Sequence, residues 1–206
     1  QIQGENAHVD RQLAENTAEL GRLRESLDQV RRDAMTDGLT NLTNRKAFDE
    51  HLAQICEHAD AEGEAVTLAI IDIDHFKHFN DAWGHQIGDQ VLRYVASVIG
   101  RLGATPRVAA RYGGEEFAII FPAESGRTAM AVLEEIRLEV SSRALKRRST
   151  NEDLGAITVS AGFAERLAGE TTMSLVERAD AALYASKHAG RNRTSAAPAL
   201  AAVAAA

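Results

Sequence analysis

The first thirty residues carry a mainly apolar seam whose successive positions are separated alternately by four and three residues. The seam consists of Ile2, Asn6, Val9, Leu13, Asn16, Leu20, Leu23, Leu27 and Val30. This spacing is the heptad repeat of a coiled coil, in which a polar Asn fixes register and strand number at some cost in stability. We therefore predict that residues 1–35 form a coiled-coil helix that pairs with a second copy as a parallel dimer. Such a helix would be roughly 50 Å long, which disfavours the alternative of one amphipathic helix packed on its own domain.

Beyond residue 35 the pattern changes to that of a globular domain, which we place at 36–195. A continuous apolar run predicts a buried strand that ends in Asp72-Ile73-Asp74. Gly113 and Gly114 lie between two apolar segments and predict the turn of a hairpin. The predicted helices cover 45–59, 90–102, 125–142 and 172–189, and the predicted strands cover 65–71, 107–110, 117–121 and 156–164.

This order of elements predicts an α/β architecture in which helices pack on a mixed sheet, with the strand of Asp72 beside the hairpin. The turn-forming residues 36–45 connect the first helix to the domain. Their spacing favours a plain capping loop over a joint that transmits force from the coiled coil. We expect the basic, polar loop at 146–153 to be solvated, and we assign no function to the alanine-rich tail at 196–206.

Composition narrows the function. The chain has 206 residues, is 45% hydrophobic and carries a formal net charge of -7, which argues against a nucleic-acid-binding surface. With Cys56 as its single cysteine, the sequence predicts a reduced, cytoplasmic compartment. No apolar run approaches the roughly 20 residues that cross a bilayer, and the first residues lack the basic-then-apolar pattern expected of a signal peptide. The sequence begins at Gln1, so a membrane anchor upstream in a longer parent protein stays an open alternative.

Acidic side chains suggest a metal site. Glu115 and Glu116 follow the glycine pair, and Asp72 ends the buried strand. Like charges about 4 Å apart repel by roughly 4 kcal/mol at an effective dielectric of 20, so a cation between these acids is favoured. A calcium loop does not fit, since Phe76 and Lys77 occupy the fifth and sixth positions. Zinc is disfavoured because the nearby ligands would be His75, His78 and His85, with no cysteine close in sequence.

Magnesium fits this donor set and is completed by water and substrate phosphates, which makes a nucleoside triphosphate the leading substrate class. Neither a Walker A loop nor a Gly-x-Gly-x-x-Gly fingerprint occurs, so cations such as Lys187 or Arg191 would hold the phosphates. The plain alternative for Lys187 is a complement to a helix dipole. Asn80 and Asp89 carry side chains able to pair with a purine edge, and an aspartate favours guanine. These residues point to metal-dependent phosphoryl or nucleotidyl transfer.

The segment Arg111-Tyr112-Gly113-Gly114-Glu115-Glu116-Phe117 resembles the signature of the GGDEF family, the diguanylate cyclases, in its Glu-for-Asp form. Further similar motifs, ordered between Thr36 and Arg193, are 37–45, Asp72-Ile73-Asp74-His75-Phe76-Lys77, Asn80-Asp81, Gly84-His85, Gly88-Asp89, 158–162, 179–184, Lys187 and Gly190-Arg191-Asn192. The resemblance implies a palm-like nucleotidyl-cyclase fold with a ferredoxin-like sheet and flanking helices. It also implies a homodimer that condenses two GTP molecules into cyclic di-GMP and two pyrophosphates.

Carried over position by position, the resemblance implies a role for each site residue. Asp72, the Ile73 carbonyl, Glu115 and Glu116 would bind two Mg²⁺ ions, for which Mn²⁺ could substitute. Glu115 would be the base and Lys77 would assist catalysis, Asn80 and Asp89 would read guanine, and Lys77, Lys187 and Arg191 would hold phosphates. The coiled coil would bring two half-sites together, and a sensor or receiver domain could precede it.

Two departures from the family pattern stand out. Ala104-Thr105-Pro106-Arg107 replaces the inhibitory Arg-x-x-Asp motif, which predicts weak product inhibition there, and Asn41 replaces a usual glycine. Three rival readings remain open: a catalytically silent GTP-binding signalling module, a cyclase that makes a hybrid dinucleotide, and a simple dimerisation module.

Overall fold

The computed structural model describes residues 16–27, 29–30, 34–146 and 153–198, and the chain divides into two compact units, Gln1–Thr36 and Asp37–Ala206. The first unit is helical at residues 16–27 and 29–30, where Leu20, Leu23, Leu27 and Val30 are 60–67% exposed. Such exposure is expected of a coiled-coil seam seen in a single chain. Ile2, Asn6, Val9 and Leu13 lie outside the described residues. Within the described ranges, no helix has the length and apolar character needed to span a membrane.

The second unit is built on a five-stranded sheet in the order β2-β3-β1-β6-β7. The strands are β1 (Val66–Ile73), β2 (Val108–Arg111), β3 (Glu116–Pro122), β6 (Val159–Glu165) and β7 (Thr194–Ala196). Neighbouring strands are antiparallel except for the parallel pair β6-β7. The first four strands have the ferredoxin-like order, and β7 makes the sheet mixed. The predicted fold class is thus confirmed, with β1 beside the hairpin strand β3.

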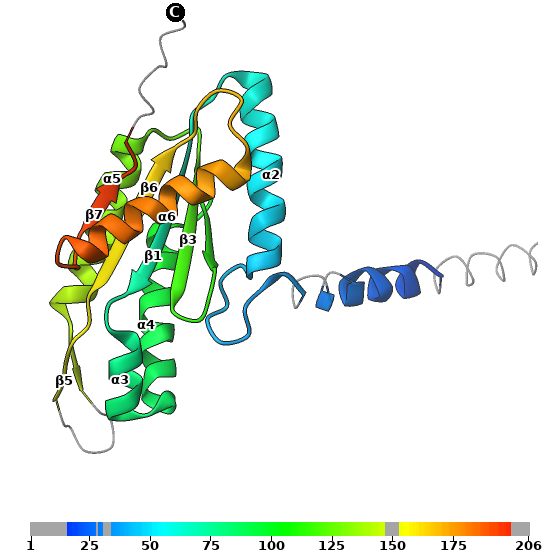
Figure 1. Ribbon diagram of the computed structural model, residues 1–206. Coiled ribbons are helices and arrows are strands. Elements are labelled where there is room, and N and C mark those ends of the chain that lie inside the picture. The colour runs from blue at the N-terminus through cyan, green and yellow to red at the C-terminus, as the bar shows by residue number, and fades with distance from the viewer. Residues whose placement is uncertain (1–15, 28, 31–33, 147–152, 199–206) are drawn as a thin grey trace, which may run out of the picture. The chain divides into compact units, whose positions relative to one another are not determined.

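Helices cover both faces of this sheet (Figure 1). They are α2 (Arg45–Glu62), α3 (Phe76–Trp83), α4 (His85–Leu102), α5 (Gly126–Ser142) and α6 (Thr172–His188). Residues of one strand parity, such as Ile71 and Ile119, pack with α3, α4 and α5. Residues of the other parity, such as Ile70 and Ile120, pack with α2 and α6. The alternation of side chains along a strand explains this division, and it directs Asp72 toward the α6 face.

Every residue of β1 is buried, as its continuous apolar sequence predicted. Gly162 lies where α6 crosses β6 most closely, because a Cβ atom there would stand 1.9 Å from the backbone nitrogen of Leu183. The glycine therefore allows the helix to approach the sheet directly. Such close packing fixes the height of α6 above the strands that carry the acidic residues.

Several predicted boundaries were wrong. Helix α2 continues to Glu62, where Gly63 adopts a left-handed conformation and ends it. The helix predicted at 90–102 begins at His85, and α3 before it was not predicted. The strand predicted at 156–164 is divided into β5 (Asp153–Ala156), which pairs with β4 (Ala144–Lys146), and β6. Strand β7 was also missed, and residues 147–152 of the basic loop predicted at 146–153 lie outside the described residues.

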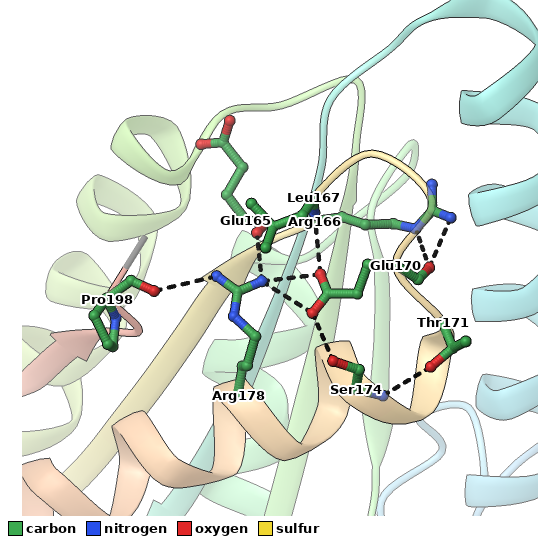
Figure 2. Close-up of polar contacts among 8 residues, drawn as sticks. All are labelled: Glu165, Arg166, Leu167, Glu170, Thr171, Ser174, Arg178 and Pro198. Carbon is green, nitrogen blue, oxygen red and sulfur yellow. Dashed lines mark hydrogen bonds and ion pairs between the residues drawn. The ribbon is translucent and has the colours of Figure 1, made fainter. Parts of the chain in front are cut away.

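A polar network ties the start of α6 to the rest of the domain, away from the acidic strand end (Figure 2). Glu170 accepts bonds from the Leu167 N–H, the Ser174 hydroxyl and Arg178, whose guanidinium lies 2.9 Å from the Glu170 carboxylate. Arg178 also donates to the carbonyls of Glu165 and Pro198. Burial alone would raise the pKa of Glu170, but these hydrogen bonds outweigh it and hold that pKa below its usual value.

Candidate active site

The acidic residues meet where β1 ends. Asp72 lies opposite Glu116 in the register of β1 and β3, and Glu115 occupies the turn just before β3. The Ile73 N–H donates to the Glu115 carbonyl at 3.3 Å, which joins the turn to the end of β1. The structure therefore brings together the three carboxylates and the backbone of Ile73, as strand pairing predicted.

Lys187 also reaches this strand end. Lys187 belongs to the last turn of α6, and its Nζ lies 2.9 Å from Oδ2 of Asp72. The pKa of Asp72 is raised to about 6, chiefly by burial. Lys187 acts to lower this pKa, and the charges of Glu115 and Glu116 act to raise it. Burial likewise raises the pKa of Glu115. One lysine thus leaves the acidic group short of positive charge.

The donor set fits a hard divalent cation. Carboxylate and carbonyl oxygens are the ligands that Mg²⁺ takes. The pKa values of Asp72 and Glu115 are raised first by burial and then by the neighbouring acidic charges, and a bound cation would offset both effects. Among the described residues, no group of three or more His, Cys, Asp or Glu side chains is arranged as a ready-made metal site. Because Asp72 pairs with Lys187 here, a metal bound at Asp72 would compete with that lysine for the carboxylate. His75 and His78 have ring centroids 6.1 Å apart.

The glycine turn serves a specific geometry. A Cβ atom at Gly113 would lie 2.6 Å from Oε2 of Glu116, so glycine leaves room for that carboxylate beside the turn. The N–H groups of Tyr112 and Gly113 both donate to the Glu116 carbonyl. Arg111 holds the tip from the other side, because its Nη2 donates to the Gly114 carbonyl at 2.7 Å.

The junction segment contacts this hairpin. Arg111 pairs with Asp37 at 3.3 Å, and Thr43 forms a parallel bridge with Ala110. Asn41 has a φ of 58°, in the left-handed region that glycine and asparagine tolerate best. Asparagine therefore satisfies the backbone requirement that a glycine at this position would meet. The junction caps α2 as its spacing favoured, because the Asn44 side chain accepts from the Ala47 N–H, and it is also bonded to the strand that leads into the turn.

Asn80 and Asp89 belong to α3 and α4. Oδ1 of Asn80 is buried without a hydrogen-bond partner. A Cβ atom at Gly88 would stand 1.8 Å from that oxygen, so the amide lies against a helix that has no side chain at this point. A buried polar atom without a partner is costly, and its cost is recovered if a ligand donates to it. Asp89, which follows Gly88 in α4, is half-buried.

The remaining predicted residues are less constrained. Lys77 is exposed on α3, and Arg191 is half-buried in the loop after α6. The sequence did not reveal how Asp74 is used: it is 5% exposed and accepts hydrogen bonds from the hydroxyls of Thr158 and Ser160. Its position two residues after Asp72 was the only signal that the sequence offered for it.

The segment that replaces the Arg-x-x-Asp motif has a structural use. Arg107 forms a two-pronged ion pair with Glu124, at 2.7 and 2.8 Å, and donates to the Leu102 carbonyl. An arginine held this way occupies the position where the motif would place an aspartate.

Comparison with known proteins agrees with this geometry. Residues 34–193 match the family described as diguanylate cyclase, GGDEF domain. The chain belongs to the GGDEF family. Diguanylate cyclase VdcA of Vibrio cholerae serotype O1 is 42% identical over 185 residues, which are 90% of this chain but 53% of VdcA, so the chain spans about half of that relative's length.

Two solved GGDEF structures extend the comparison. The coiled coil and GGDEF domain of DgcB from Caulobacter crescentus, in complex with c-di-GMP, is 67% identical with a TM-score of 0.87, covering 92% of this chain and 99% of that one. Diguanylate cyclase SiaD from Pseudomonas aeruginosa, in complex with its activator SiaC, is 33% identical with a TM-score of 0.78, covering 94% and 75%. GGDEF proteins similar to this chain therefore include one solved with its coiled coil and one solved with an activator.

Proposed function

We propose that the chain is a diguanylate cyclase, a nucleotidyltransferase that converts two GTP into cyclic di-GMP and two pyrophosphates. The observation that carries the proposal is the meeting of Asp72 and Glu116 across β1 and β3, with Glu115 in the adjoining turn. In each of two successive steps, a ribose 3′-oxygen bonds to the α-phosphorus of the facing GTP. The bond from that phosphorus to the pyrophosphate breaks, and pyrophosphate leaves with the bonding electrons.

Glu115 is the proposed base for the 3′-hydroxyl proton. Its pKa is raised by burial, which makes it a better proton acceptor than an ordinary carboxylate. Asp72, the Ile73 carbonyl, Glu115 and Glu116 would hold two Mg²⁺ ions, or Mn²⁺ in their place. Bound there, the metal would offset charge that develops on the α-phosphate. Lys187, released from Asp72, would hold phosphates together with Lys77 and Arg191.

Guanine is the proposed base. The partnerless Oδ1 of Asn80 can accept from a nucleobase amino group, and Asp89 can accept from the N1–H and exocyclic amine that guanine presents together. Adenine offers an aspartate no such pair of donors. This argument supports GTP over a hybrid dinucleotide made partly from ATP.

The reaction needs two facing sites, so a homodimer through residues 1–35 is part of the proposal. Its support is the row of exposed apolar residues on the first unit and the coiled coil present in the DgcB structure. The enzyme would need access to cellular GTP, so the proposed location is the cytoplasm. A sensor or receiver domain joined upstream stays a prediction.

The test is turnover by a matched pair of variants. Purified protein is incubated with GTP and Mg²⁺, and the products are separated by chromatography. Glu115→Gln should abolish cyclic di-GMP formation while sedimentation still reports a dimer. Glu177→Gln, the same change at an exposed position of α6, should behave as wild type. A wild-type dimer that binds GTP without forming product would identify the chain as a silent signalling module instead.

A further inference from the structure

Both carboxylate oxygens of Asp74 accept hydrogen bonds from other residues of the domain. Oδ1 accepts from the Ser160 hydroxyl at 2.7 Å, and Oδ2 accepts from the Thr158 hydroxyl at 2.7 Å and from the Asn192 backbone N–H at 3.0 Å. Its own N–H donates to the Thr158 carbonyl at 2.9 Å. With both oxygens occupied and only 5% of the residue exposed, Asp74 is unsuited to bind a metal or a substrate directly.

The third bond reaches the loop that follows α6. Gly190, Arg191 and Asn192 have φ values of 109°, 61° and 46°, so two residues with side chains adopt the left-handed conformation. Such residues persist where the surroundings impose the conformation. Here the Asn192 N–H is held by Asp74, and Oδ1 of Asn192 accepts from Arg137 of α5 at 3.1 Å. The loop is thus clamped between the end of β1 and α5.

Arg191 lies inside this clamp. Its N–H donates to the Ser186 carbonyl at 3.1 Å, while the next residue is the one held by Asp74. Lys187, which reaches Asp72, belongs to the same helix end. The direction of the Arg191 side chain therefore depends on a backbone conformation that the buried carboxylate of Asp74, just after β1, maintains.

We propose that Asp74 is a positioning residue for substrate phosphates: it fixes the left-handed loop so that Arg191 points toward the triphosphate bound at Asp72. This proposal rests on the proposed function. It assigns different tasks to the two acids of Asp72-Ile73-Asp74, because Asp72 faces the reaction and Asp74 holds the loop behind the phosphate-binding cation.

The experiment is a double-mutant cycle on KM for GTP. Asp74→Ala should raise KM roughly tenfold, with a smaller change in kcat. This is the fold-change expected when Arg191 loses one hydrogen bond to a charged substrate phosphate. In an Arg191→Ala background the same substitution should change KM less than twofold, because its effect passes through Arg191. Asp180→Ala, at an exposed position of α6, is the control. A full effect of Asp74→Ala that persists without Arg191 would overturn the proposal.

Asp74→Asn covers the case in which the alanine variant does not fold. It keeps one oxygen for the Asn192 N–H, and we expect a KM increase of roughly threefold that disappears with Arg191→Ala. An Asp74→Asn variant whose increase is the same in both backgrounds would contradict the assignment.

Trypsin provides a readout that does not need turnover. The folded protein is treated with trypsin under native conditions, and cleavage after Arg191 is measured by mass spectrometry. This cleavage should be several-fold faster in Asp74→Ala than in wild type or Asp180→Ala. An unchanged cleavage rate would refute the clamp. A wild-type protein that makes no cyclic di-GMP would refute the proposed function alone, since proteolysis still decides the role of Asp74 in holding the loop.

Discussion

Replacing Gly88 with alanine should weaken GTP binding while leaving the domain folded. The new Cβ would be placed 1.8 Å from Oδ1 of Asn80 and 3.3 Å from Cζ of Phe76. Because α4 and the phenyl ring are part of the packed core, the Asn80 amide is the group free to move. To move from 1.8 Å to an ordinary contact distance of 3.4 Å, its oxygen must shift by about 1.6 Å, which displaces it from the position in which it would contact guanine.

The size of the effect follows from two opposing terms. A displaced amide loses one good contact to a base, worth about 1–3 kcal/mol, which corresponds to a KM increase of roughly 5-fold to 150-fold. Alanine is favoured over glycine inside a helix by about 1 kcal/mol, so the stability of α4 should not fall. Reduced affinity without reduced stability is the distinguishing result.

The assay combines steady-state kinetics with urea unfolding. Gly38→Ala is the matched control, since nothing lies within 4 Å of a Cβ atom placed there and its φ is not in the left-handed region. The control should keep the wild-type KM and unfolding midpoint. A folded Gly88→Ala variant whose KM for GTP stays within twofold of wild type would show that the Asn80 amide does not read the base.

Three further outcomes test other parts of the structure. Glu170→Gln should lower the free energy of unfolding by about 2 kcal/mol at pH 7. The pKa of Glu170 is lower in the folded protein than in the unfolded chain. The stabilisation is therefore present above the unfolded pKa and is lost as pH falls through the folded pKa. Urea midpoints of wild type and variant that differ equally at pH 7 and pH 3 would contradict this. Gly162→Ala should cost at least about 3 kcal/mol or prevent folding, since the backbone of Leu183 blocks the new methyl, and a wild-type melting curve would refute that packing. Initial rates should be insensitive to micromolar cyclic di-GMP acting at residues 104–107, and a steep fall, relieved by substitutions there, would contradict the expectation.

The sequence predicted the parts of the fold that carry long, regular patterns. The apolar run of β1 and the paired glycines of the hairpin located the sheet centre, and both together predicted that Asp72 would lie near the acids of the hairpin tip; the register that places it opposite Glu116 came from the structure. Strand β7 escaped because three small residues carry no pattern of their own and pair with β6 only once the chain has folded. Helix α3 escaped because its eight residues are too short for a clear helical period.

The candidate site likewise contains residues whose roles could be predicted from the sequence and contacts that could not. Adjacent carboxylates could be interpreted from charge repulsion alone, whereas the roles given to Asn80 and Asp89 in reading guanine came mainly from family resemblance. Neither source indicated that Gly88 makes room for Asn80, or that Asp74 is bonded to residue 192, because these contacts join segments whose spacing is set by loop conformation. Left-handed residues such as Arg191 have no signature in a single sequence.

The direction of β7 has a practical consequence. Since β7 is parallel to β6, and β6 is antiparallel to β1, the chain runs away from Asp72 as it passes through its last strand. The Ala197 N–H then donates to the Phe163 carbonyl, and Pro198 lies beside Arg178 at the opposite end of the sheet. A fluorescent reporter or a surface-immobilisation tag joined directly after Pro198 would therefore start at the end of the sheet opposite Asp72, so turnover could be followed on tethered protein.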